Sequence, residues 1–437
     1  MTSIPFPRRS RRAAFAIVAG LTALTVLASC SDNADTPPTT SGPAKIEFWG
    51  FVPGLEDLVQ KYNAKNNGTT VEFHRMTGDD SSKVGPAVDA GTGPDIVQLS
   101  PLDLPDYVIR NRIVDITGFV QSDQDKYTPS SWSQFVLNGK VWGVPQDIGP
   151  RALMYRTDIF QKYGLTVPKT WDDYLAQARK LKAASPGSYF GDIDPTAAGA
   201  WKADVIQAQG SWYGTKGDAW TLSLNNAASQ TVADRWQTLV SEKLVAIDPG
   251  WTPAFWKNVS TGKYATLIAP SWYPVLVEQN IPDTSGKWAL APLPTIGDSK
   301  AVGDDGGSGD VVLRGTKFPK QASDFIRWLN SSEETAEPLI TKGGLYPASK
   351  LGLESPALAK AWPFFGGQKI NDIYRDAAAN VPPVWVNGPT WGADQASLMD
   401  EFAKAFNGKQ TFRASLDIGQ EAAVKHMKDR GLSVTAG

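Results

Sequence analysis

Aromatic side chains, rather than histidine or cysteine, are the unusual chemical resource of this chain. Its 437 residues include 16 tryptophans but only two histidines, His74 and His426, and one cysteine. The chain therefore has few side chains for histidine-dependent catalysis. Neither the zinc-protease motif H-E-x-x-H nor the nucleophile-elbow motif G-x-S-x-G occurs. A flat, rigid indole can instead cover the apolar face of a ring-shaped molecule, although most tryptophans of a folded chain lie in its core. These residue types favour the binding of a small molecule, and we expect neither a catalytic site, nor a metal, nor a cofactor.

The single cysteine, Cys30, follows a segment typical of export. Four arginines within residues 8–12 precede the uncharged stretch 13–28, which is shorter than the roughly 20 residues that span a membrane. We interpret residues 1–29 as a signal peptide. Leu27-Ala28-Ser29-Cys30 resembles the bacterial lipobox, in which the cysteine thiol receives a diacylglyceryl group. We therefore expect a lipid anchor at Cys30, on the extracytoplasmic face of the cell membrane, followed by a flexible tether over residues 30–44. Whether export is general or twin-arginine stays open.

The charge balance argues against nucleic acid as a partner. Cleavage after residue 29 removes four of the 43 Lys and Arg residues and none of the 45 Asp and Glu residues, which leaves a net charge of about −6. No basic patch is evident in the sequence. A chain of this size usually divides into two lobes.

The spacing of apolar residues predicts an α/β organisation. Residues 46–49 are typical of a strand, and Leu55, Leu58, Val59 and Tyr62 recur at the spacing of an amphipathic helix. Strands are also expected at 71–73 and 96–99. This order favours a parallel sheet whose carboxyl-end loops line a crevice. Further on, Thr170 and Asp173 form a capping box that starts a helix, and 322–329 is typical of another.

Several motifs occur in an order that is specific to one family. The chain contains G-K-V-W-G-V-P-Q-D at 139–147, A-L-M-Y-R-T-D-I-F at 152–160 and P-K-T-W-D-D at 168–173. It also contains G-P-D-I-V at 93–97, G-K-Y-A-T at 262–266 with Ser271-Trp272, and G-G-L-Y-P-A at 343–348. Together they resemble the extracellular solute-binding proteins of ABC importers, in the maltose-binding-like carbohydrate group. Trp142, Arg156 and Asp173 depart mildly from the family's usual Tyr, Asn and Glu.

The resemblance implies a two-lobe, periplasmic-binding-protein-like (type II) α/β fold with a ligand cleft between the lobes. Crossing segments would form the hinge, near Pro145–Gly149, Ala289–Pro292 and Leu345–Ala348. The implied N-terminal lobe comprises residues 45–147 and 291–344, and the C-terminal lobe comprises 148–290 and 345–437.

Candidate ligand-binding residues follow from motif position and side-chain chemistry. Trp272 matches the aromatic residue of the family's G-x-W segment, and Trp212 stands where related sugar binders carry an aromatic residue that faces the ligand. Trp391 is a candidate because it opens a predicted helix after a Gly/Pro loop. Trp49, Trp251 and Trp385 are further candidates, for which a core position is an equal alternative. Asp147 and Arg151 flank the first crossing, and a turn or cap is the alternative for Asp147. Loop residues are candidates for backbone or side-chain hydrogen bonds to the ligand, namely Phe51, Ser100, Asp305, Gly306 and Gly307. For the two glycines, a role in forming a turn is an equal alternative.

The implied function is capture of a sugar, with a lean towards a di- or oligosaccharide, and its delivery to the permease subunits of an ABC transporter. We expect a monomer that is not an enzyme. The alternative is a lipid-anchored glycoside hydrolase acting on oligosaccharides, because any chain with 45 acidic residues contains carboxylate pairs. Which sugar is bound, and its linkage, stay open.

Overall fold

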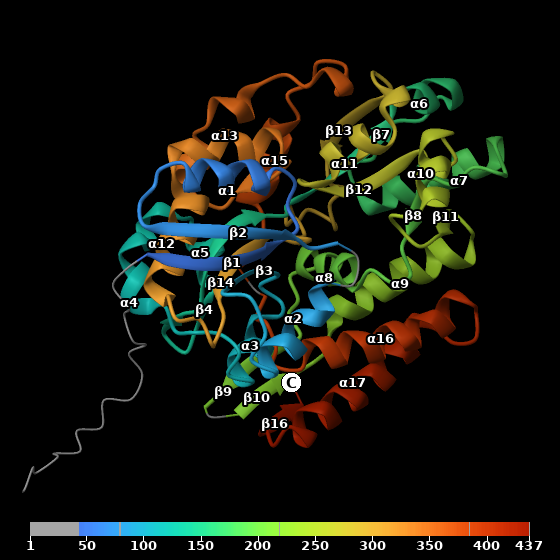
Figure 1. The fold of residues 1–437 in the computed structure, drawn as a ribbon. Helices are drawn as coiled ribbons and strands as arrows, with labels where there is room; N and C mark the ends of the chain where they lie inside the picture. The colour runs from blue at the N-terminus through green and yellow to red at the C-terminus, as the bar shows by residue number, and fades with distance from the viewer. Residues whose placement is uncertain (1–42, 78–79, 218, 384, 437) are drawn as a thin grey trace, which may run out of the picture. The chain divides into compact units, whose positions relative to one another are not determined.

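The computed structural model describes residues 43–77, 80–217, 219–383 and 385–436. The expected signal peptide, Cys30 and nearly all of the tether lie outside the described residues. Two mixed α/β units can be recognised, each with its own sheet and hydrophobic core, which agrees with the expected fold class (Figure 1). No helix among the described residues has the length and apolar character needed to cross a membrane.

The larger sheet has six strands in the order β15-β6-β14-β3-β1-β2. Its strands are β1 (Ala44–Gly50), β2 (Thr69–Arg75), β3 (Ile96–Leu99), β6 (Gly143–Ile148), β14 (Ser308–Val312) and β15 (Tyr346–Pro347). β1 pairs in parallel with β2 and β3, which confirms the predicted parallel arrangement. β14 runs antiparallel to both β3 and β6.

Helices cover both faces of this sheet. Side chains alternate along its strands, so each face presents apolar residues against which a separate set of helices packs. Val312 of β14 packs in one cluster with residues of α1 and α12, whereas Val311 packs in another with residues of α2 and α3. The helices associated with these clusters are α1 (Leu55–Asn63), α2 (Asp80–Asp89), α3 (Leu104–Ile109), α4 (Thr117–Val120), α5 (Pro129–Ser133), α12 (Pro319–Ser331) and α13 (Glu333–Thr341), with the 3-10 helix η1 (Gln121–Lys126). The predicted helix over 55–62 is confirmed, and its four apolar residues are buried.

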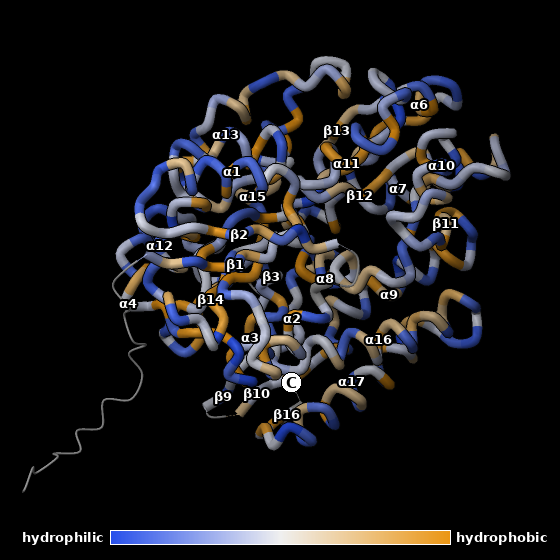
Figure 2. The backbone as a smooth tube through the Cα atoms, viewed as in Figure 1, coloured by the Kyte–Doolittle hydropathy of each residue, from blue (hydrophilic) through white to orange (hydrophobic). Residues whose placement is uncertain are grey.

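The second unit is built around the three-stranded antiparallel sheet β12-β7-β13. Its strands are β7 (Arg151–Arg156), β12 (Thr266–Pro270) and β13 (Trp288–Pro292). Figure 2 shows the hydrophobic character of β12. Leu153 points into a core cluster with α7, α8, α9, α16 and α17, and its neighbours Ala152 and Met154 point into a second cluster on the opposite face.

The remaining elements extend this second unit. Its helices are α6 (Thr157–Tyr163), α7 (Trp171–Ala184), α8 (Ala198–Gln207), α9 (Ala227–Ser241), α10 (Pro253–Ser260), α11 (Tyr273–Asn280), α14 (Lys350–Leu353), α15 (Ile370–Ala379), α16 (Trp391–Phe406) and α17 (Phe412–Asp429), with η2 (Pro282–Thr284), η3 (Pro356–Ala359) and η4 (Pro363–Phe365). Its small sheets contain β8 (Gly191–Ile193) with β11 (Val245–Ile247), and β9 (Tyr213–Lys216), β10 (Ala219–Leu222) and β16 (Val434–Ala436). A separate hairpin joins β4 (Val136–Leu137) to β5 (Lys140–Val141). The capping box of Thr170 and Asp173 at the start of α7 is confirmed.

The chain passes between the two sheets at defined positions. β6 ends at Ile148 and β7 begins at Arg151, so Gly149 and Pro150 form the first passage. The second passage differs from the expectation of Ala289–Pro292, because those residues pair with β7 inside the smaller sheet. Leu293 and Val302 still pack in the core of the second unit, and the chain enters the larger sheet only at Ser308. The two passages meet where Pro150 bridges Asp304.

Candidate binding site

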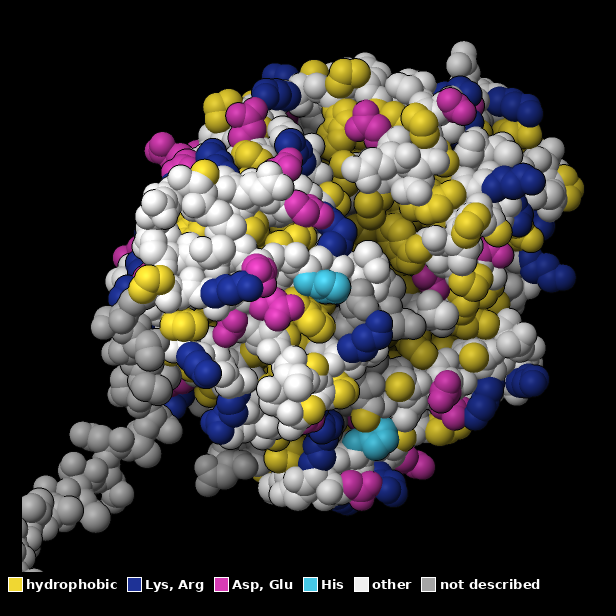
Figure 3. Space-filling model, viewed as in Figure 1, with side chains coloured by type: hydrophobic (Ala, Val, Ile, Leu, Met, Phe, Trp, Pro, Cys, Tyr) yellow, Lys and Arg dark blue, Asp and Glu magenta, His cyan; other side chains and the backbone are white. Residues whose placement is uncertain are grey.

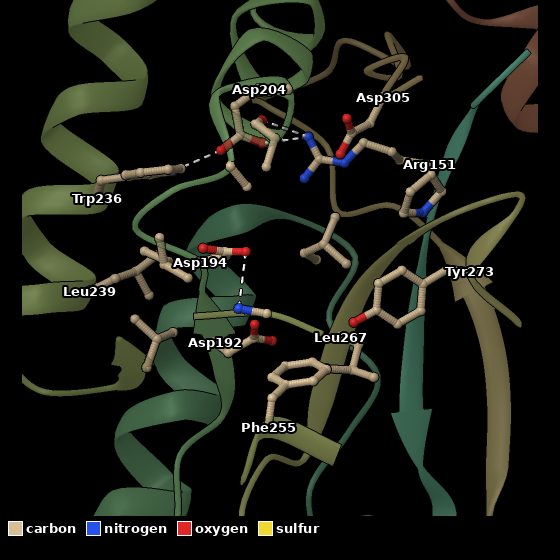
Figure 4. Close-up of a pocket in the computed structure, with 18 of the residues that line it drawn as sticks. Arg151, Asp192, Asp194, Asp204, Trp236, Leu239, Phe255, Leu267, Tyr273 and Asp305 are labelled. Atoms are coloured by element: carbon tan, nitrogen blue, oxygen red, sulfur yellow. Dashed lines mark hydrogen bonds and ion pairs between the residues drawn. The ribbon is translucent and has the colours of Figure 1, made fainter. Parts of the chain in front are cut away.

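The cavity lined by Trp251 and Trp272, which we call the first cavity, lies beside the two passages and has a volume of about 190 Å³. Figure 3 shows hydrophobic side chains gathered in a hollow over the region of α8 and β12. Figure 4 shows a close-up of the cavity. The residues that line it and matter most for its chemistry are Arg151, Asp192, Asp194, Asp204, Arg235, Trp251, Phe255, Trp272, Tyr273 and Asp305. Four of these residues were predicted from the sequence, namely Arg151, Trp251, Trp272 and Asp305.

An aromatic wall forms one side of this cavity. The ring of Trp251 lies 5.5 Å from that of Trp272 and 5.1 Å from that of Tyr273. Trp251 keeps 48% of its surface exposed, although it is a large apolar residue. Its φ of +65° places a bulky side chain in the left-handed region, which is strained for such a residue. Strain of this kind clusters at ligand-binding sites.

Trp272 is fixed against the second passage. Its Nε1 donates a hydrogen bond of 2.8 Å to the carbonyl oxygen of Asp305. The neighbouring Gly306 has a φ of +116°, and a Cβ atom there would lie 2.8 Å from that same Nε1. The close approach of the indole to the backbone therefore requires glycine at this position. Trp272 lines both the first cavity and the neighbouring cavity that contains Phe51 and Asp147.

A buried ion-pair network forms the floor of the cavity. Arg151 Nη1 donates to Asp204 Oδ1 at 3.0 Å, and Arg235 lies 2.8 Å from the other carboxylate oxygen of Asp204. Burial acts to raise the pKa of Asp204, but the charges of Arg235 and Arg151 outweigh it and hold that pKa below its usual value. Arg235 also lies 3.9 Å from the centre of the Trp171 ring. Since both arginines are engaged with Asp204, this network chiefly fixes α8 and α9 against β7.

Two polar groups in the cavity have free hydrogen-bonding capacity. Figure 4 shows the carboxyl group of Asp192 and the hydroxyl group of Tyr273 directed towards the ring of Phe255. Neither side chain makes a hydrogen bond to another described residue. Burial, reinforced by the charges of Asp194 and Asp248, raises the pKa of Asp192 to about 7. Asp194 differs, because its carboxylate accepts from the backbone amides of Thr196 and Gly250.

Asp192 and Tyr273 are therefore functional candidates that the sequence did not single out. Tyr273 follows the predicted Trp272 directly, so its neighbourhood was a usable signal. Asp192 carries no such signal, because nothing in its local sequence distinguishes it from the other acidic residues.

The neighbouring cavity, of about 370 Å³, brings together five of the predicted residues. These are Phe51, Asp147, Trp272, Gly306 and Gly307. The backbone amides of Phe51 and Val52 are not free, because both donate to Gln98 Oε1. Asp147 is only 6% exposed and accepts a 2.6 Å hydrogen bond from Ser308 Oγ. Burial raises the pKa of Asp147 to about 7.

A further cavity, of about 320 Å³, contains the predicted Trp385. In the first unit its walls come from residues 101–102, 104–105, 130, 133–134 and 136–137. The other walls come from Lys202 and Ile206 of α8, from Asp304, and from residues 381–383 and 385–387. Trp385 Nε1 donates to Asn387 Oδ1 at 3.0 Å, and Asn387 Nδ2 donates to the carbonyl oxygen of Pro101 at 2.8 Å. These bonds fix the orientation of the indole within the wall.

Four predicted residues lie outside these three cavities. Trp212 and Trp391 are 1% and 4% exposed and stack on each other in the core, with ring centres 5.3 Å apart. Trp212 Nε1 donates to Ser229 Oγ, so even its polar atom is satisfied internally. Trp49 packs against His74 and donates to Glu47. Ser100 Oγ accepts from the amide of Leu102 and so stabilises a turn.

The arrangement as a whole can bind a ring-shaped, hydroxyl-bearing molecule. Indoles offer flat stacking surfaces, and Asp192 and Tyr273 offer hydrogen-bonding groups in the same space. No group of three or more His, Cys, Asp or Glu residues that could hold a metal ion was found within the described parts of the chain.

Comparison with known proteins agrees with this chemistry. The family model described as "Bacterial extracellular solute-binding protein" matches residues 50–336. The chain is 24% identical to an arabinooligosaccharide-binding protein of Bacillus subtilis over 74% of this chain and 77% of that protein. It is 25% identical to a lactose-binding protein of Rhizobium radiobacter over 84% of this chain and 88% of that protein.

Solved structures give the same picture. The galacto-N-biose/lacto-N-biose I-binding protein of an ABC transporter from Bifidobacterium longum, in complex with lacto-N-biose, matches with a TM-score of 0.83 and 28% identity, over 91% of this chain and all of that one. An ABC-transporter-associated binding protein from B. animalis subsp. lactis, in complex with β-1,6-galactobiose, matches with a TM-score of 0.82 and 28% identity, over 90% of this chain and all of that one.

Proposed function

Because this chain belongs to the bacterial extracellular solute-binding protein family, we propose that it captures a neutral di- or oligosaccharide and delivers it to the permease subunits of an ABC transporter. The observation that carries this proposal is the first cavity, where a strained, half-exposed indole stands beside Trp272, Tyr273 and the free carboxyl group of Asp192. Relatives named for arabino-oligosaccharides and lactose, and structures solved with disaccharides, support a sugar as the ligand.

The proposed contact residues are those that line the first cavity and its neighbour. Trp251, Trp272 and Phe51 supply apolar surface, and Asp192, Tyr273, Asp305 and Asp147 supply hydrogen-bonding groups. Arg151 contributes by holding Asp204 and α8 in place. Trp212, Trp391, Trp49 and Ser100 are left out, because each is engaged within the protein.

The proposal extends to how the protein works at the membrane. The units built around the two sheets act as lobes, divided near residues 148–150, 303–307 and 345, and they close around the sugar. Cys30 carries the diacylglyceryl anchor, which holds the monomeric protein on the extracytoplasmic face of the membrane next to the permease.

The experiment that tests this function is calorimetric titration of the full-length protein, in detergent, with lacto-N-biose, β-1,6-galactobiose, lactose and arabino-oligosaccharides. We expect at least one of these glycans to bind with a dissociation constant near the micromolar range, about −8 kcal/mol. Chromatography of the glycan after incubation should return it intact, since the family consists of binding proteins. Absence of binding by every glycan would contradict the proposal, and shortened products would support a glycoside hydrolase.

A further inference from the structure

Lys202 is an anomaly among the buried cations of this protein. It lies on α8, is only 3% exposed, and lines the cavity that contains Trp385. The other buried cations each face a carboxylate: Arg151 and Arg235 pair with Asp204, and Arg156 pairs with Asp158. Among the described residues, the Nζ atom of Lys202 has neither a hydrogen-bond acceptor nor an ion-pair partner.

A buried ammonium group that makes no direct hydrogen bond or ion pair is costly. Removing a charge from water costs several kcal/mol unless a partner compensates for it. Within the cavity, the one other charged residue of the described wall is Asp304. The charge of Lys202 opposes the raised pKa that burial gives Asp304 and Asp305, so these carboxyl groups compensate part of that charge without forming an ion pair with it. The Asp304 Oδ1 atom already accepts from the amide of Gly149 at 2.8 Å. Lys202 therefore lines open space that a ligand can fill, and its donors are not used by another described residue.

We propose that this cavity is a second ligand compartment, which holds an uncharged sugar unit whose hydroxyl oxygens accept hydrogen bonds from Lys202. This inference rests on the proposed function of the protein. Lys202 and Asp304 balance one another in charge, and every other described wall residue is uncharged, so the compartment suits a neutral unit rather than an acidic one. Trp385, held by Asn387, supplies a flat surface, and Pro101, Pro382 and Pro383 supply rigid apolar walls.

The position of the compartment explains how one ligand can reach both cavities. Gly199 and Ala200 of α8 line the first cavity, and Lys202 lines the second. Likewise, Asp305 lines the first cavity and the preceding residue, Asp304, lines the second. Two elements are thus shared, α8 and the second passage, and a ligand of at least two sugar units is needed to occupy both compartments.

The decisive experiment compares Lys202→Met with the wild type on two measurements. The first is calorimetric affinity for β-1,6-galactobiose or lacto-N-biose, whichever the wild type binds, and for galactose. Loss of hydrogen bonds to a charged group should weaken disaccharide binding about tenfold to a hundredfold, while galactose affinity stays within about twofold. The second is the melting temperature without ligand, which should stay within about 2 °C, because the substitution breaks no ion pair or hydrogen bond to another described residue.

The matched control is Lys428→Met, which removes an exposed lysine from α17 and should change neither measurement. Undiminished disaccharide affinity in Lys202→Met, or an affinity loss accompanied by a fall in melting temperature of more than about 5 °C, would overturn the proposal. The proposal would also be overturned if the wild type bound the uronic-acid analogue more tightly than the neutral disaccharide. If Lys202→Met does not fold, Asp304→Asn serves instead and should lower disaccharide affinity while sparing galactose. Failure of the wild type to bind any glycan refutes the proposed function itself. This outcome is therefore distinguishable from a failure of the inference about Lys202 alone.

Discussion

Trp251 offers the sharpest test of the first cavity. We expect Trp251→Ala to weaken sugar binding while leaving the fold intact, because about half of the side chain is exposed. The tryptophan side chain presents about 200 Å², and 48% exposure leaves about 100 Å² for a ligand to cover. At about 25 cal/mol per Å², full coverage contributes about 2.5 kcal/mol, and coverage of one face about half of that. The dissociation constant should therefore increase roughly eightfold to seventyfold.

The backbone of Trp251 provides an internal check. Alanine keeps the strain of a left-handed φ, whereas glycine relieves it, so Trp251→Gly should unfold with a free energy about 1 kcal/mol higher than Trp251→Ala. Both variants should bind sugar equally weakly. Calorimetry gives the affinities and urea unfolding gives the stabilities. Ile418→Ala, which truncates another exposed apolar residue in α17, is the control. A Trp251→Ala protein that binds as tightly as the wild type would refute the assignment of this indole to the site.

Three further predictions concern stability. Because burial, with Asp194 and Asp248, raises the pKa of Asp192 from 3.8 to about 7, the folded state holds a proton that the unfolded state has released. The free energy of unfolding should therefore fall as pH rises from about 4 to 7, and Asp192→Asn should flatten part of this profile in urea titrations. Trp212→Ala should cost about 3–5 kcal/mol in the same assay, since it empties a core site; a loss below about 1 kcal/mol would contradict its placement. Thr170→Ala should cost about 1 kcal/mol by removing the cap of α7, and an unchanged midpoint would show the cap to be dispensable.

Local chemistry was enough to predict some elements. The amphipathic spacing in α1 and the capping box of α7 depend on residues within a few positions of each other, and the structure has both. The helix α2 was not predicted, because Gly85 and Pro86 interrupt its pattern. The second passage was placed too early, since nothing in the sequence of Ala289–Pro292 reveals that β13 pairs with β7.

The binding site was less predictable for a physical reason. A tryptophan faces a cavity or the core according to what packs on it, and Trp212 meets Trp391 across 179 positions of sequence. The importance of Asp192 and Lys202 lies in the cavities that they line and in hydrogen-bonding groups that no other described residue uses, which are properties of three-dimensional surroundings. The predicted residues that do line cavities, such as Trp272 and Asp305, belong to motifs beside the passages, where the chain geometry leaves little freedom.

The tight contact between the two passages limits how this protein can diversify. A side chain at Gly149 would place a Cβ atom 2.4 Å from the carbonyl oxygen of Asp305 in the other passage. One at Gly303 would place it 2.1 Å from the carbonyl oxygen of Ala203 in α8, against which the second passage packs. Substitution of these glycines is therefore sterically excluded, whereas wall positions such as Trp251 and Trp385 can vary. Anyone redesigning the protein as a biosensor for a new glycan should leave the passages untouched and randomise the walls.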